Sequence, residues 1–181
     1  MEAIAREEDL VPHRVARAIA RGRIVIPANP TRPHRLCAIG GEGCRVRVNV
    51  NVGTSGTRCD EDLEVEKAKA ALREGADALM DLSTGGDLVR IRRRILELDA
   101  PVGTVPVYEA VRRAGGSAAD VDGDLLFKVI REHCKQGVDF LTLHCGVNRD
   151  ALASLRADPP GRWALSAGGG GVPRGDDGRD R

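Results

Sequence analysis

Valine alternates with polar residues over residues 45–53, and this period of two is the clearest strand signal in the chain. Short apolar runs predict three further strands, over residues 78–83, 101–108 and 139–145. Helical spacing of apolar residues follows each strand and predicts helices over residues 60–74, 86–99, 124–136 and 149–157. Four strand-then-helix units in succession indicate a parallel sheet with right-handed crossovers.

Two α/β architectures fit this rhythm, an open doubly wound sheet and part of a (β/α)8 barrel. A dinucleotide-binding fold would carry G-x-G-x-x-G after its first strand. The chain instead reads Gly53-Thr54-Ser55-Gly56, without the third glycine, and has no Walker A phosphate loop. The residues alone leave both architectures open.

The chain divides into three regions by its pattern. Residues 1–44 form an N-terminal accessory segment without strand-helix rhythm, in which residues 9–22 predict a short helix ended by Gly22. Residues 45–158 hold the four strand-helix units. Residues 159–181 are rich in glycine and lack periodicity, so we expect them to be disordered.

Composition narrows the class of protein. Hydrophobic residues make up 41% and charged residues 30%, the net charge is +1 and aromatics are 2%, so neither nucleic acid nor a membrane is an expected partner. No apolar run is long enough for a membrane span or a secretory signal, which predicts a cytoplasmic location. The five cysteines include no C-x-x-C pair, and we expect most of them to be small buried thiols.

Strand ends are where function gathers in strand-helix folds, and polar residues stand there in this chain. Asn51 closes the first strand, Tyr108 the third and His144 the fourth, next to Cys145. Residues 81–86 leave the second strand as a polar, glycine-rich turn, either a helix N-cap or an anion-binding nest. The remaining histidines, His13, His34 and His133, receive no predicted role.

Several longer strings carry a specific resemblance. They are R-G-R-I-V-I-P-A-N at residues 21–29, N-V-N-V-G-T-S at 49–55, G-A-D-A-L-M-D-L-S-T-G at 75–85, P-V-G-T-V-P-V-Y at 101–108 and Q-G-V-D-F-L-T-L-H-C-G-V at 136–147. In sequence and order, over about residues 9 to 157, they resemble the phosphomethylpyrimidine synthases, radical enzymes of thiamine biosynthesis.

The resemblance implies a fold and a reaction. The expected fold class is α/β, the first half of a (β/α)8 TIM-type barrel behind a short N-terminal segment. The expected reaction converts 5-aminoimidazole ribotide to 4-amino-5-hydroxymethyl-2-methylpyrimidine phosphate, a radical lyase reaction. The family's substrate contacts correspond to Asn51, Met80, Tyr108 and His144. Met80 would otherwise be predicted as core, and no catalytic residue is named.

The resemblance also implies cofactors: a [4Fe-4S] cluster, S-adenosylmethionine, and zinc or iron. Their family ligands, two later histidines and C-x-x-C-x-x-x-x-C, are absent from the sequence, as is the S-R-G-G phosphate segment. We therefore expect no metal ligand in this chain, no activity from it alone, and a homodimer at full length. A frameshift after Gly161 is one hypothesis for the tail, because another reading frame can encode S-R-G-G.

Two alternative functions stay open at this point. One is 5-hydroxybenzimidazole synthase, which uses the same ribotide to make a cobamide lower ligand and shares the architecture. The other is a non-catalytic half-barrel that binds a ligand. A half-barrel has two open sheet edges and an uncovered face, so we expect that the chain does not complete its own fold.

Overall fold

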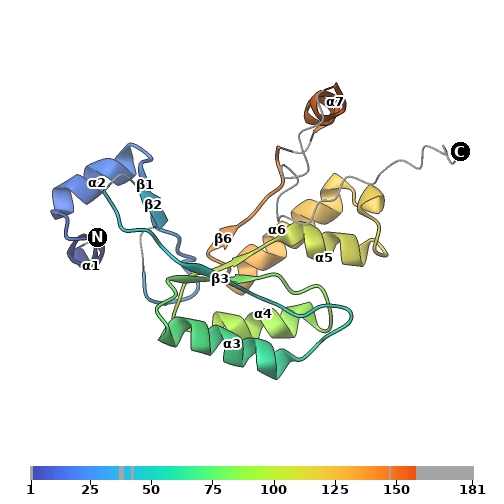
Figure 1. The fold of residues 1–181 in the computed structure, drawn as a ribbon, viewed down its shortest axis with the longest axis horizontal. Coiled ribbons are helices and arrows are strands. Elements are labelled where there is room, and N and C mark those ends of the chain that lie inside the picture. Colours follow the sequence, from blue (N-terminus) through green and yellow to red (C-terminus); the bar gives the residue numbers. More distant parts are fainter. Residues whose placement is uncertain (1, 37–38, 42, 147, 158–181) are drawn as a thin grey trace, which may run out of the picture. The chain divides into compact units, whose positions relative to one another are not determined.

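A computed structural model describes residues 2–36, 39–41, 43–146 and 148–157 (Figure 1). The chain forms two compact units, the first ending at Leu143 and the second beginning at His144. Each unit is described by itself. The predicted disordered tail, residues 159–181, lies outside the described residues.

A four-stranded parallel sheet is the centre of the first unit. Its strands are β3 (Asn49–Val52), β4 (Ala78–Asp81), β5 (Val102–Thr104) and β6 (Phe140–Leu141), and they pair in this order. Asn51 pairs with Met80, Met80 with Gly103, and Gly103 with Phe140. The predicted α/β class and the parallel sheet are therefore confirmed.

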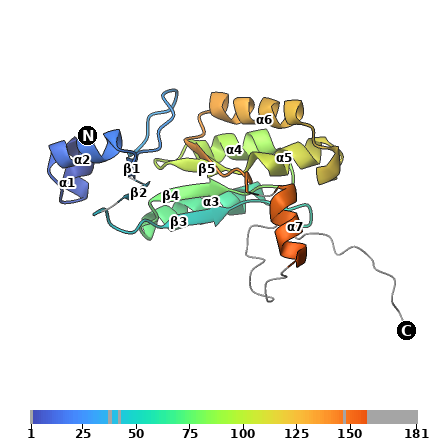
Figure 2. The same cartoon turned by 90° about the horizontal axis from the view of Figure 1, so that it is seen from above.

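Helices connect the strands and begin and end at recognisable residues. They are α3 (Glu61–Arg73), α4 (Leu88–Leu96), α5 (Pro106–Arg113), the short η1 (Ala118–Asp120) and α6 (Gly123–Gln136), and α5 and α6 lie side by side (Figures 1 and 2). The side chains of Asp60, Asp87 and Asp122 accept the amide hydrogens that α3, α4 and α6 leave unpaired at their starts. Gly137 ends α6 with a φ of 103°, in the left-handed region that favours glycine.

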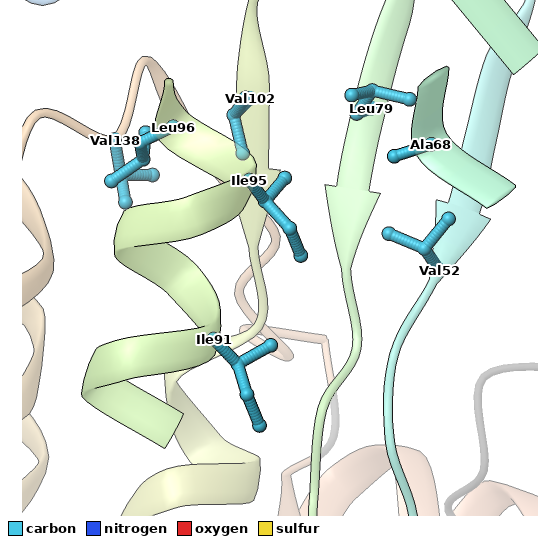
Figure 3. Close-up of a cluster of buried hydrophobic side chains, with 8 residues drawn as sticks. All are labelled: Val52, Ala68, Leu79, Ile91, Ile95, Leu96, Val102 and Val138. Atoms are coloured by element: carbon cyan, nitrogen blue, oxygen red, sulfur yellow. The ribbon is translucent and has the colours of Figure 1, made fainter. Parts of the chain in front are cut away.

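The main core lies between one face of the sheet and the helices (Figure 3). It consists of Val52, Leu79 and Val102 from the strands, Ala68 from α3, Ile91, Ile95 and Leu96 from α4, and Val138. Each large side chain buried in this way contributes roughly 1.5–3 kcal/mol. Because strand side chains alternate between faces, Asn49 and Asn51 lie on the opposite face, where both are exposed.

The N-terminal segment has a small core of its own. Helices α1 (Glu2–Glu7) and α2 (Pro12–Ala20) precede β1 (Ile24–Val25), which pairs antiparallel with β2 (Ile39–Gly41). Ile4, Ala5, Val15 and Ile24 are buried together. Pro12 occupies the first turn of α2, as the sequence predicted, because proline has no amide hydrogen to lose there.

Asp139 joins this segment to the amino edge of the sheet, where the parallel strands begin. Its side chain is fully buried and accepts hydrogen bonds from the amides of Asn29 and Val102, each at 2.8 Å. His34 Nε2 lies 2.8 Å from Asp139 Oδ1, and Arg32 forms an ion pair with Oδ2. The segment is thus held to β5 and β6 through one carboxylate.

Asp77 plays the same part at the start of β4. Its buried carboxylate accepts from the amide of Val48 at 2.9 Å and from Arg47 Nη1 at 2.7 Å. Burial alone would raise the pKa of Asp77. These hydrogen bonds and the charges of Arg45 and Arg47 outweigh burial, so the pKa of Asp77 lies below its ordinary value. Arg47 also pairs with Glu7 at 2.8 Å, so α1 is linked to the sheet.

All four predicted strands extend beyond the observed ones, the second ending at Asp81 rather than at residue 83. The first strand begins at Asn49, since Val46 is 90% exposed and β4 offers partners only from Ala78 onward. The third strand ends at Thr104, because Pro106 starts the unpredicted helix α5. The fourth ends at Leu141 rather than at Cys145.

The second unit contains α7 (Arg149–Ala157) among its described residues. Asn148 begins this helix, because its side-chain oxygen accepts from the amide of Ala151 at 2.8 Å. The predicted fourth helix is therefore present. In the described parts of both units, no helix is long and apolar enough to cross a membrane.

Candidate functional site

Asn51 and Met80 lie side by side on the face of the sheet opposite the main core. They are register partners on β3 and β4, and Gly103 of β5 follows in the same row. Asn51 is exposed, whereas Met80 is only 9% exposed. The row therefore offers an amide that can donate and accept, beside an apolar thioether. Gly103 is covered by the ring of Phe140, which a Cβ on Gly103 would approach to 2.2 Å.

Two rim loops, residues 53–59 after β3 and 82–86 after β4, lock together at the carboxyl edge. The amide of Thr84 donates to the carbonyl of Thr54 at 2.8 Å, and Thr54 Oγ1 donates to the carbonyl of Gly85 at 2.7 Å. Ser83 Oγ accepts from the amide of Thr54 at 3.2 Å. These contacts fix the loops that flank Asn51 and Met80.

Glycine is required where these loops touch. A Cβ on Gly85 would lie 2.2 Å from the carbonyl oxygen of Ser55, and a Cβ on Gly53 would lie 2.6 Å from the backbone of Leu82. Gly53 also has a φ of 151°, outside the range that side-chain-bearing residues favour. The glycines of both strings therefore serve the close packing of one loop on the other.

Of the two interpretations of residues 81–86, the helix N-cap is wrong and the anion-binding nest stays a prediction. The cap of α4 is Asp87, whose carboxylate accepts from the amide of Arg90 at 3.0 Å, so no residue of 81–86 caps the helix. The hydroxyls of Ser83 and Thr84 bond to Thr54 in the neighbouring loop instead of facing a ligand. An anion nest would be formed by backbone amides and not by these hydroxyls.

Tyr108 lies in the first turn of α5, not on a strand. It is half-buried, and its amide donates to the carbonyl of Val105 at 3.2 Å. Pro106 at the helix start explains the change, because its fixed φ suits the first helical turn. Tyr108 still follows the carboxyl end of β5, the edge at which Asn51 and Met80 lie.

His144 belongs to the second unit, whereas the other three predicted contacts belong to the first. It is exposed and lies three residues after the end of β6. Of the four predicted substrate contacts, Asn51 and Met80 are direct neighbours and Tyr108 shares their unit. The expected contact set of four stays a prediction.

A buried polar network on the helix side of the sheet was not predicted. His133 of α6, 2% exposed, lies 2.8 Å from both Thr104 Oγ1 and Glu109 Oε2, and Arg92 of α4 pairs with the same carboxylate. His133 received no role because it lies on a helix far in sequence from its partners. Its place on the apolar face of α6 was the only available signal.

Charge in this network is set by burial and by hydrogen bonds. Burial raises the pKa of Glu109, but the hydrogen bond to His133 and the charge of Arg92 outweigh it and lower that pKa to about 2. At Asp81, at the end of β4, burial prevails and raises the pKa of the carboxyl group despite hydrogen bonds from Ser83. Glu109 is thus held as an anion that ties α4, α5 and α6 together.

The cysteines differ from the prediction of buried thiols. Cys59, Cys134 and Cys145 are exposed and Cys44 is half-buried, while Cys37 lies outside the described residues. Among the described residues, no group of three His, Cys, Asp or Glu side chains could hold a metal ion. The described residues therefore do not fit an iron-sulfur cluster or a zinc ion.

One cavity of about 560 Å³ lies on the helix side, near the starts of α3 and α4. It is lined by Cys59, Asp60, Glu61, Asp62, Arg90 and Arg94. Its arginines are paired with its acids, Arg90 with Glu61 and Arg94 with Asp62, both at 2.6 Å. None of the predicted substrate contacts lines it, so we do not identify it with the site of Asn51 and Met80.

The sequence is similar to known proteins over most of its length. Residues 1–172 match the model of the radical SAM ThiC family. A protein named phosphomethylpyrimidine synthase from Methanopyrus kandleri is 50% identical over 171 residues, covering 92% of this chain. A namesake from Thermus thermophilus is 48% identical over 174 residues, covering 94%.

The chain spans 40% of the length of each of these two relatives. A third relative, phosphomethylpyrimidine synthase 1 of Methanothermobacter thermautotrophicus, is 44% identical over 174 residues and is again covered to 40%. The similarity therefore shows the family, but it covers less than half of the length of each of these relatives.

Proposed function

Because the chain belongs to the radical SAM ThiC family, we propose that its four strand-helix units form the substrate-binding first half of a (β/α)8 phosphomethylpyrimidine synthase. The parallel order β3-β4-β5-β6 supports this, since it is the order that successive barrel strands take. The exposed face that carries Asn49 and Asn51 is the face that would line the barrel interior.

The proposed substrate is 5-aminoimidazole ribotide and the product is 4-amino-5-hydroxymethyl-2-methylpyrimidine phosphate, formed by a lyase in the cytoplasm. The names of the relatives favour this reaction over 5-hydroxybenzimidazole synthesis. We assign a homodimer to the full-length enzyme.

Four residues are proposed to touch the ribotide: Asn51, Met80, Tyr108 and His144. The observation that carries the proposal is the exposed Asn51 beside Met80 on the sheet face opposite the main core. Asn51 supplies an amide that can pair with a polar edge of the imidazole, and Met80 an apolar contact for its ring. At Gly103 the row is closed by the ring of Phe140, because a Cβ on Gly103 would lie 2.2 Å from that ring.

Radical chemistry in this family requires a [4Fe-4S] cluster and S-adenosylmethionine. Since the described residues do not fit a metal or a cluster, we derive no step through these groups. The role proposed for the residues of this chain is to bind and orient the ribotide, and not to generate the radical.

Ribotide binding to the 181-residue chain tests the proposal. Titration with 5-aminoimidazole ribotide, followed by calorimetry, is expected to saturate at one site. Asn51→Ala should weaken the affinity about tenfold, the effect of losing one or two well-placed hydrogen bonds.

Asp120→Ala is the control, because Asp120 is exposed on a different element, η1. Asn49 would be unsuitable, since its Nδ2 donates to Asn51 Oδ1 at 3.5 Å. Asp120→Ala should leave the affinity within about twofold of the wild type. Absence of saturable binding, or equal losses in the two variants, would overturn the assignment of the site.

A further inference from the structure

A stretch of the N-terminal segment carries an unbalanced positive charge. Residues 10–41 contain six arginines and no aspartate or glutamate, although the whole chain has a net charge of only +1. Two of these arginines, Arg32 and Arg35, form ion pairs with Asp139 and Asp77 at the amino edge of the sheet. The remaining four lie elsewhere.

These four arginines, Arg14, Arg17, Arg21 and Arg23, line a single cavity of about 380 Å³. Leu10, Ala18, Ile24 and Gly43 complete its described lining, which includes no carboxylate. A volume of this size is ordinary for a small-molecule site, and its apolar residues supply a wall against which a ligand can pack.

Helix geometry brings three of the arginines onto one face of α2 and its end. Arg14, Arg17 and Arg21 are spaced by three and four residues, while Val15 on the other side of α2 is fully buried. Like charges at this spacing destabilise a helix, and α2 has no acidic residue in its first turn to offset Arg14. The helix dipole favours Arg17 and Arg21 near the end of α2, but it disfavours Arg14 at the start.

Internal partners do not account for these three side chains. Within the described part of the chain, no carboxylate forms an ion pair with Arg14, Arg17 or Arg21, and all three are exposed. Guanidinium groups stay protonated near neutral pH and present a planar pair of donors that matches a phosphate. Three or four of them around one cavity fit a ligand with at least two negative charges.

From these observations, we propose that the cavity of Arg14, Arg17, Arg21 and Arg23 binds a small phosphorylated molecule that carries two or more negative charges. This site shares no residue with the row of Asn51 and Met80. The inference therefore stands whether or not the ribotide binds at Asn51 and Met80. The N-terminal segment then has a binding function besides its contacts with the sheet.

Inorganic pyrophosphate is the probe, titrated into the 181-residue chain at constant ionic strength and followed by calorimetry. The double variant Arg14→Gln/Arg17→Gln should weaken binding at least tenfold. The matched control Arg6→Gln/Arg93→Gln removes the same charge from exposed positions outside the cavity and should change the affinity less than twofold. Circular dichroism of both variants should match the wild type, because all four side chains are exposed.

Amide NMR signals locate the binding, with pyrophosphate shifts expected at residues 10–24 and 43. Equal losses in both double variants would show general charge attraction and overturn the site, as would a wild type that does not bind pyrophosphate. Tighter binding of a single-stranded oligonucleotide, displaced by salt but not by pyrophosphate, would overturn a small-molecule ligand in favour of nucleic acid.

Discussion

The carboxylates that anchor the amino edge of the parallel sheet are buried, whereas Asn51 at the carboxyl edge is exposed. At the amino edge, Asp77 and Asp139 are fully buried and their oxygens are occupied by backbone amides and arginines. At the carboxyl edge, Asn51 is exposed, and the nearby rim loops bond to each other rather than to its amide. The difference indicates that the amino edge serves stability and the carboxyl edge is left for a ligand, as in strand-helix barrels generally.

Loss of the Asp139 carboxylate should have the largest effect on stability. Asp139→Ala leaves Arg32 and the amide of Val102 without their partner in a buried setting, which should lower the free energy of unfolding by about 3–5 kcal/mol. Urea denaturation measures this change. Asp120→Ala, at an exposed position of η1, should stay within about 0.5 kcal/mol, and equal effects would refute the structural role of the amino edge.

The buried network of Glu109 should make the protein sensitive to acid. Because the folded pKa of Glu109 is lowered from 4.5 to about 2, its contribution to stability is present above pH 4.5 and is lost as the pH falls toward 2. The full contribution corresponds to about 3 kcal/mol.

Denaturation of the wild type and Glu109→Gln at a series of pH values measures this contribution. The wild type should be the more stable above pH 4.5, and the difference should shrink steadily below it. Asp81, whose raised pKa acts in the opposite sense, is present in both proteins and cancels in the comparison. A difference independent of pH would contradict the account.

The contact between the rim loops should be of intermediate importance. Gly85→Ala places a Cβ against the carbonyl of Ser55 and should cost about 1–3 kcal/mol, because backbone must move to admit it. Gly123→Ala at the start of α6 meets nothing within 4 Å and should be neutral or stabilise by up to about 1 kcal/mol. Thermal melts of the two variants compare them, and equal melting temperatures would show that the loops are not tightly packed.

Asn51 should contribute least to stability. Since its side chain is exposed, Asn51→Ala should change the free energy of unfolding by less than about 0.5 kcal/mol, even though we expect it to weaken ribotide binding. Urea denaturation of Asn51→Ala, run together with Asp139→Ala and Asp120→Ala, measures this free energy. A loss above about 2 kcal/mol would mean that Asn51 is a structural residue and would remove the contrast between the edges.

The order of the elements could be predicted from sequence because hydrophobic period is a local property. The alternation of apolar and polar residues predicted β3, and the helical spacing of apolar residues predicted α3, α4, α6 and α7. Strand length is not local, since it depends on which partner residues exist. Val46 alternates correctly but is 90% exposed, and Val48 meets β4 only through its carbonyl, which accepts from the amide of Ala78 at 3.3 Å, so both lie outside the strand.

The candidate site was predicted in part for the same reason. Asn51 lies near the carboxyl end of β3 and Met80 near the carboxyl end of β4. Their proximity therefore follows from the parallel order of these neighbouring strands. The anchoring of Asn29 and Arg32 by Asp139 could not be derived, because it joins residues more than a hundred positions apart. His133 was missed in the same way, and Tyr108 was placed on a strand because the helix-starting effect of Pro106 was overlooked.

NMR mapping of ribotide binding tests the contrast between the edges most directly. On addition of 5-aminoimidazole ribotide to the 181-residue chain, we predict shifted amide signals at residues 51–54, 80–86 and 103–108. Residues 77–78 and 138–139 at the amino edge should not shift. Shifts concentrated at the amino edge, or none at Asn51 and Met80 at saturation, would contradict the assignment of the carboxyl edge as the binding edge.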